Sequence, residues 1–212
     1  MEVYEFGNAD SQLTLMQPVD THSLAMIEDE IALIRKNTDK DFRFVAFKVD
    51  DWNSDLSPWS APAVFGDNDF GGQAKRTLEE ILRYCESRPV TYYIGGYSLA
   101  GLFSIWAAYQ TDMFSAVAAV SPSVWFPGFG TYMHENEIKC KNVYLSLGDK
   151  EEKVKNPVMA TVGDNIRAAD SLLKEQGVNC TFEWNPGNHF KDVDIRTVRG
   201  FLWIMDLPLC QI

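Results

Sequence analysis

A short glycine-rich segment behind an apolar run constrains the fold of this chain more than any other feature. The run Val90–Ile94 has the composition of a buried strand, and GGYSLAG, residues 95–101, follows it directly. Leu99 then opens a helical pattern that continues to about Tyr109. Small residues let a strand turn sharply into a helix, and a serine held on that turn exposes its hydroxyl above the sheet edge. This segment, which we call the elbow, therefore predicts a strand–turn–helix unit with Ser98 at its tip.

Strand-like runs alternate with amphipathic helical patterns along the chain. The predicted strands are Glu2–Phe6, Gln12–Met16, Phe42–Val49, Val90–Ile94, Ala116–Val120, Val143–Leu147 and Cys180–Trp184. Besides the elbow helix, apolar helix faces are marked within Leu24–Ile34, Ala74–Cys85, Met159–Leu173 and Val198–Met205. Such alternation predicts an α/β fold with a mostly parallel sheet of about seven strands and helices on both faces. Because there is no internal repeat or linker-like segment, residues 1–212 are expected to form a single domain without a cap domain.

Three histidines are the candidates for the base that a nucleophilic serine needs. His22 and His134 lie in polar stretches that we expect to be exposed. His189 follows the predicted strand Cys180–Trp184 and precedes a helical pattern, which places it on a loop at the carboxyl end of a strand, where open α/β sheets keep their sites. We therefore expect His189 to serve Ser98 as the base. The alternative is a turn histidine that caps a helix.

The acid that would orient the histidine is expected on the turn after Val143–Leu147. Gly148 opens this turn, and Asp149, Glu151 and Glu152 crowd it with three carboxylates. Only one of them can face the histidine. The spacing from the glycine favours Glu151, with Asp149 as second choice and Glu152 as third. The unused carboxylates are expected to form a solvated charge cluster.

The fourth expected part of the site is a pair of backbone N–H groups that would stabilise an oxyanion. One is the N–H of Leu99, the residue after the serine. The second should come from residues 17–20, which follow the predicted strand Gln12–Met16. Pro18 has no N–H, so Val19 or Asp20 is the expected donor.

Two aromatic segments are expected to border the same cleft. Residues 50–72 are predicted to form a loop of over twenty residues, and loops of this length inside compact domains are usually functional or disordered. Their aromatic content argues against disorder. Residues 121–129 follow the strand after the elbow. We expect a pocket wall for an apolar acyl or alcohol group, with a satellite hydrophobic cluster as the alternative. The predicted wall residues are Trp52, Trp59, Phe65 and Trp125.

Composition excludes several classes of partner. The formal net charge of −11 argues against nucleic acid and anionic membranes. No run of 18 or more apolar residues is present, so no membrane span is expected, and the acidic N-terminus lacks the pattern of a signal peptide.

The cysteines at 85, 140, 180 and 210 lack metal-ligand spacing. We expect thiols in a reducing compartment, no bound metal and a cytoplasmic protein.

Taken together, these segments resemble the esterase family of α/β hydrolases that includes esterase D (S-formylglutathione hydrolase), feruloyl esterases and enterobactin-type siderophore esterases. The resemblance extends from about Leu13 to Trp203. It is carried by residues 51–59, 70–72, 96–101, 121–125, 148–151 and 187–190. It implies a serine hydrolase without metal or organic cofactor. It also implies that Ser98 is the nucleophile, His189 the base and Glu151 the acid.

The chain departs from the family pattern in three features that bear on function. Ala100 occupies the position of the second glycine in the G-x-S-x-G pattern, with Gly101 one place later. The histidine–glycine oxyanion loop of other hydrolases is absent, and no arginine cluster marks the chain for a catecholate siderophore. The substrate therefore cannot be transferred from any one relative.

The function predicted from the sequence is cleavage of a small-molecule carboxylic ester or thioester through an acyl-enzyme on Ser98. Two alternatives stay open. The same three residues could serve an acyltransferase that passes the acyl group to an alcohol instead of water. The fold could also be kept as a binding module without turnover.

Overall fold

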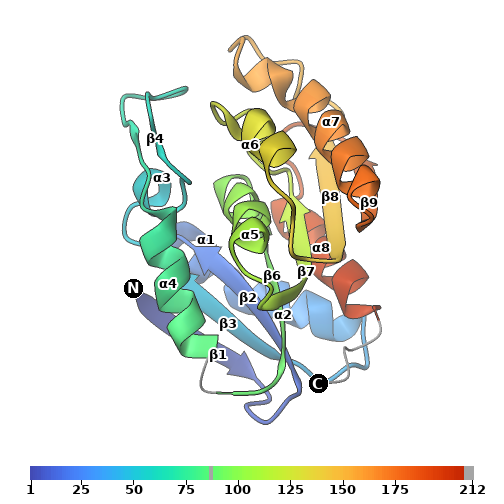
Figure 1. The fold of residues 1–212 in the computed structure, drawn as a ribbon. Helices are drawn as coiled ribbons and strands as arrows, with labels where there is room; N and C mark the ends of the chain where they lie inside the picture. Colours follow the sequence, from blue (N-terminus) through green and yellow to red (C-terminus); the bar gives the residue numbers. More distant parts are fainter. Residues whose placement is uncertain (86–87, 208–212) are drawn as a thin grey trace.

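The computed structural model describes residues 1–85 and 88–207 (Figure 1). In this part of the chain, seven strands form one sheet in the order β1-β3-β2-β6-β7-β8-β9. Every neighbouring pair is parallel except β1 with β3, so the predicted mostly parallel α/β sheet is confirmed. The strands are β1 (Glu2–Gly7), β2 (Leu13–Val19), β3 (Arg43–Lys48), β6 (Thr91–Tyr97), β7 (Phe114–Val120), β8 (Asn142–Gly148) and β9 (Asn179–Asn185).

Helices cover both faces of the sheet, and each face has its own apolar core. In β3, Phe44 and Ala46 point into one core while Val45 and Phe47 point into the other, as the two-residue period of a strand requires. The first core is closed by α2 (Ile27–Lys36) and α8 (Val193–Met205). The second is closed by α4 (Ala74–Cys85), α5 (Leu99–Gln110), α6 (Phe129–Glu135) and α7 (Val162–Glu175). The short α1 (Thr21–Ala25) precedes α2, and a 3-10 turn, η1 (Met159–Thr161), precedes α7.

The two central strands run further than the sequence predicts. The prediction ends β6 at Ile94, but the strand continues through Gly95 and Gly96 to Tyr97 because these residues pair in register with β7. Likewise β2 continues to Val19 instead of ending at Met16, since residues 14–19 stay paired with β3. Pairing with a neighbour can hold glycine or proline in a strand that local composition would end.

Residues 50–72 form an ordered segment and not the long loop that the sequence predicts. They contain α3 (Trp52–Asp55) and a small hairpin of β4 (Ser60–Ala61) and β5 (Phe70–Gly71). The Asp51 carboxylate caps α3 by accepting the N–H of Ser54 at 3.0 Å, and hydrophobic periodicity does not register a cap of this kind. Figure 1 shows this segment in cyan at the same end of the molecule as α6 in yellow.

The cysteines are placed largely as expected for core residues. Cys85 and Cys140 are buried and Cys180 is half-buried in β9, whereas Cys210 lies outside the described residues. None of the described helices combines the length and apolar character that a membrane span requires. Across residues 1–85 and 88–207, no group of three or more His, Cys, Asp or Glu side chains is arranged to hold a metal ion.

Candidate active site

The elbow holds Ser98 in a conformation that few non-glycine residues adopt. Its φ is 58° and its ψ is −119°, between the last residue of β6 and the first of α5. A Cβ placed on Gly96 would lie only 2.6 Å from the Cβ of Ala100, so this position must be glycine. The absence of that Cβ makes room for the methyl group of Ala100, which explains why alanine fits where the usual pattern has a second glycine.

A chain of hydrogen bonds joins a carboxylate, an imidazole and the Ser98 hydroxyl. Nδ1 of His189 lies 2.6 Å from Oε2 of Glu151, and Nε2 lies 3.0 Å from Oγ of Ser98. An ionised carboxylate only accepts, so Nδ1 carries the hydrogen and donates it to Glu151. Nε2 of the neutral ring then accepts the hydroxyl hydrogen of Ser98. In this arrangement the imidazole is ready to take a proton from the serine.

Glu151 is surrounded by donors in the protein interior. Its other oxygen, Oε1, accepts from the Gly148 N–H at 2.7 Å, the Ser121 hydroxyl at 2.8 Å and Nη2 of Arg196 at 2.6 Å. Burial by itself would raise the pKa of this carboxyl. The hydrogen bond and charge of His189, together with the hydrogen bonds from Arg196 and Gly148, outweigh burial and lower the pKa to about 2. Glu151 is therefore ionised at neutral pH.

The other two carboxylates of the turn face elsewhere. Asp149 accepts the N–H of Gly187 at 2.8 Å, which braces the loop before the histidine. Glu152 lies 3.1 Å from the guanidinium of Arg167 at the surface. Of the three candidates for the acid, the geometry brings Glu151 to the imidazole.

Residues with strained backbone conformations lie at or beside the hydrogen-bonded groups of Ser98, His189 and Glu151. Among the described residues, three non-glycine residues have positive φ: Ser98 at 58°, Ser121 at 43° and Asp192 at 53°. Ser121 donates to Glu151, and Asp192 lies three residues after His189 at the start of α8. Strain of this kind persists only where the surroundings over-determine it, and it concentrates at functional sites.

The backbone donors expected for an oxyanion belong to Leu99 of the elbow and to Val19 or Asp20 at the carboxyl end of β2. Leu99 is the first residue of α5, so its N–H has no carbonyl partner within the helix. The carbonyl of Val19 accepts from the N–H of Val49 at 2.9 Å, so the backbone polar groups of Val19 face β3. Asp20 follows β2 directly and precedes α1. Its carboxylate caps α1 by accepting the N–H of Ser23 at 2.7 Å.

Three of the four predicted wall residues, Trp59, Phe65 and Trp125, belong to one connected set of aromatic rings. The ring of Phe65, which is 45% exposed, lies 5.9 Å from that of the buried Trp125, and both contact Phe70. Trp59 packs against the aromatic rings of α6 and against Phe126, whose ring also contacts Phe70, and it donates its indole N–H to a backbone carbonyl. Trp52 is half-buried at the start of α3. Trp52 and Trp59 both pack against the main apolar core of this face and do not form a separate satellite cluster.

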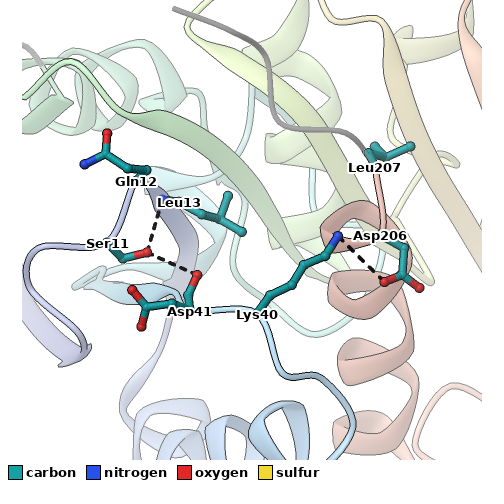
Figure 2. Close-up of a pocket in the computed structure, with 7 residues that line it drawn as sticks. All are labelled: Ser11, Gln12, Leu13, Lys40, Asp41, Asp206 and Leu207. Carbon is teal, nitrogen blue, oxygen red and sulfur yellow. Dashed lines mark hydrogen bonds and ion pairs between the residues drawn. The ribbon is translucent and has the colours of Figure 1, made fainter.

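A cavity of about 550 Å³ lies away from this constellation (Figure 2). Its lining comes from the segments before β2 and β3 and from the end of α8, so it lies at the amino ends of those strands. Ser98, Glu151 and His189 lie at the carboxyl ends. The lining residues are Ser11, Gln12, Leu13, Lys40, Asp41, Asp206 and Leu207. The cavity is therefore separate from the candidate site.

Sequence inspection missed three side chains at the site. Arg196 reaches Glu151 from the buried face of α8, and a charged residue on an apolar helix face is the signal that could have found it. Oγ of Ser123 lies 3.3 Å from Oγ of Ser98. The Tyr97 hydroxyl donates to the backbone carbonyl of His189 at 2.9 Å. No local pattern marks either of these contacts.

Comparison with solved structures identifies the fold. An IroE-like serine hydrolase from Shewanella oneidensis matches with a TM-score of 0.74 at 16% identity, over 97% of this chain and 77% of that one. The chain has the α/β-hydrolase fold. Other α/β hydrolases with this architecture include a siderophore hydrolase, EstA, from Aspergillus nidulans, with a TM-score of 0.67 at 18% identity over 93% of this chain and 84% of that one.

A third match is the enterobactin esterase FES from Shigella flexneri, with a TM-score of 0.64 at 14% identity over 97% of this chain and 56% of that one. The resemblance to esterases that the sequence predicts is thus confirmed at the level of the fold. No protein-family model and no curated protein sequence matches this chain.

Proposed function

We propose that this protein is a serine hydrolase that cleaves a carboxylic ester or thioester through an acyl-enzyme on Ser98. The observation that carries the proposal is the hydrogen-bonded chain from Glu151 through His189 to Ser98, with the serine on a strained turn. A nucleophile, a base and an orienting acid in this sequence of contacts make up a catalytic triad. The esterase matches share the fold that would present such a triad.

In the proposed reaction, Oγ of Ser98 attacks the acyl carbon while Nε2 of His189 takes the hydroxyl proton. The tetrahedral intermediate collapses as the imidazolium returns that proton to the leaving alcohol or thiol. His189 then deprotonates a water molecule, which attacks the acyl-enzyme and releases the carboxylic acid and Ser98. Throughout these steps Glu151 remains ionised, keeps the hydrogen on Nδ1 and stabilises the imidazolium.

The proposed oxyanion hole combines the N–H groups of Leu99 and Asp20. We favour Asp20 over Val19 because the backbone of Val19 is turned toward β3. A donor aimed at the developing oxyanion contributes roughly 3–4 kcal/mol of transition-state stabilisation. Asp20 is the N-cap of α1 and Leu99 is the first residue of α5, and N–H groups at such positions lack intrahelical partners.

The proposed substrate is a small-molecule ester with a short or aromatic acyl group. The exposed ring of Phe65 above Trp125 offers an apolar surface, and we keep Trp52 and Trp59 as further wall residues. Apolar contact is worth about 0.8 kcal/mol per buried CH₂. Rates on p-nitrophenyl esters should therefore rise over short acyl chains and fall once the chain outgrows the surface. Steadily climbing rates on long chains would contradict this substrate class, and acyl products formed with added alcohols would indicate a transferase.

The nucleophile is tested by labelling with an active-site phosphonate, followed by peptide mapping. We expect Ser98→Ala to abolish labelling and to lower kcat on any accepted ester by about 10⁴-fold or more, with unchanged thermal unfolding. Ser123→Ala is the matched control, since it removes a neighbouring buried hydroxyl and should retain labelling. Labelling that persists in Ser98→Ala, or that maps to Ser121 or Ser123, would overturn the assignment.

A further inference from the structure

Arg196 joins the two segments that carry the acid and the base. Its side chain is only 2% exposed, and it projects from α8. Nη2 donates to Oε1 of Glu151 at 2.6 Å and also to the hydroxyl of Ser121. Nη1 donates to the backbone carbonyls of Asn188 at 3.2 Å and Lys191 at 3.4 Å, on either side of the histidine. One guanidinium therefore bridges the acid turn, residues 148–152, and the histidine loop, residues 186–192.

The bridge holds the histidine loop from two sides. Carbonyls before and after His189 are bound by Arg196, while the carbonyl of His189 itself accepts from the hydroxyl of Tyr97. A planar guanidinium presents its donors in a fixed fork, so it fixes the distance between the groups that it binds. The 2.6 Å contact between Nδ1 of His189 and Glu151 joins the two segments that Arg196 bridges.

The guanidinium also balances the charge of the buried carboxylate. Glu151 offers Oε1 to Arg196 and Oε2 to His189, so the same carboxylate contacts a permanent cation and the proposed base. Tyr97 of β6 also faces the guanidinium, and its ring centroid lies 5.3 Å away. Without Arg196, the buried carboxylate of Glu151 would lie beside the imidazole with no permanent cation to balance its charge.

We propose that Arg196 is a positioning residue for the hydrolysis: it keeps Glu151 fixed and ionised, and it locks the histidine loop onto the acid turn so that the imidazole meets both Glu151 and Ser98. This inference rests on the proposed function. If the salt bridge between α8 and the acid turn were purely structural, its removal would lower the stability of the protein and nothing else. The tests therefore measure catalytic quantities that do not change when stability alone changes.

The first test measures ester hydrolysis by folded variants at α8. We expect Arg196→Met to lower kcat by about 100-fold, the scale of a small misplacement of reacting groups. Arg196→Lys retains the charge without the fork and should lose about 10-fold. Arg199→Met is the control, because Arg199 is exposed one turn along the same helix and binds the side chain of Asn185. Its kcat should stay within about 2-fold of the wild type.

The second test is the pH profile of kcat/KM. Without the guanidinium, the uncompensated carboxylate attracts a proton onto the imidazole, so the acidic limb of Arg196→Met should move to higher pH by about one unit. The profile of Arg199→Met should not move. A profile of Arg196→Met that coincides with the wild type would overturn the inference.

The third test is a double-mutant cycle with Glu151→Gln. Because both roles of Arg196 serve the contact between Glu151 and His189, which Glu151→Gln already weakens, Arg196→Met should cost less than about 10-fold in the Glu151→Gln background. This double variant removes both charges together and should fold even if Arg196→Met alone does not. Fully additive losses would overturn the inference. A wild-type protein that takes no phosphonate label and hydrolyses no ester would instead refute the proposed function.

Discussion

Two glutamates lie in the interior of this protein with almost the same exposure, Glu151 at 5% and Glu30 at 7%. Glu151 belongs to the candidate site at the carboxyl ends of the strands. Its two oxygens receive hydrogen bonds from a histidine, an arginine, a serine and a backbone N–H, and its pKa is lowered to about 2. It is buried as a carboxylate.

Glu30 lies in α2, on the opposite face of the sheet from the elbow helix. Among the described residues, its Oε1 atom has no hydrogen-bond partner. Burial raises the pKa of this carboxyl to about 8, opposed by the Gln17 amide and reinforced by the charge of Asp194. It is buried as a neutral acid at pH 7. Depth alone therefore does not decide the charge of a buried acid; the donors aimed at it do.

The sharpest test of this contrast is catalytic. We expect Glu151→Gln to lower kcat on an ester by roughly 10³–10⁴-fold, because the amide cannot stabilise the imidazolium. Asp149→Asn and Glu152→Gln are matched controls from the same turn and should stay within about 10-fold. If Asp149→Asn proves the most damaging of the three, Asp149 is the acid and the assignment of Glu151 is wrong.

A second test measures the stability of the protein at acidic pH. The folded pKa of Glu151 is lowered from 4.5 to about 2, so its carboxylate stabilises the fold above about pH 4.5. That contribution is lost as the pH falls from about 4.5 to about 2. The free energy of unfolding from urea titrations should therefore differ most between the wild type and Glu151→Gln above pH 4.5. A gap that stays constant down to about pH 2.5 would contradict the lowered pKa.

The contribution of Glu30 to stability should change with pH in the opposite direction. A carboxyl whose pKa is raised from 4.5 to about 8 binds a proton on folding, so its contribution to stability falls as the pH rises from about 4.5 to about 8. Glu30→Gln should remove that slope and stabilise the protein by on the order of 1–3 kcal/mol at pH 8 relative to the wild type. Its kcat should stay within about 2-fold of the wild type, since Glu30 contacts none of the proposed catalytic groups. A wild-type unfolding curve that is flat over this pH range would contradict the assignment.

Local sequence patterns account for the architecture and for the order of the proposed catalytic groups. The alternation of strands and helices predicts the α/β sheet because each pattern spans only a few consecutive residues. The elbow predicts the turn at Ser98, since small residues there are required by contacts within the turn itself, such as Gly96 with Ala100. The spacing from Gly148 favours Glu151 for the same reason, because Glu151 accepts the Gly148 N–H three residues away.

Other features depend on partners that are distant in sequence. β6 and β2 continue past their predicted ends because neighbouring strands pair with them. The two aromatic segments pack together because Trp59 meets Phe126 and Phe129, about seventy residues further along the chain.

By itself, the sequence determined which residues form the elbow, the acid turn and the histidine loop, because short-range sterics and periodicity define each of these segments. Only the tertiary structure decided how they are held together. Arg196 meets Glu151 across 45 residues and Ser121 across 75, and Tyr97 meets the carbonyl of His189 across 92. It also decided that Glu151 is ionised and Glu30 neutral, because the charge of a buried acid depends on donors that folding brings from other elements.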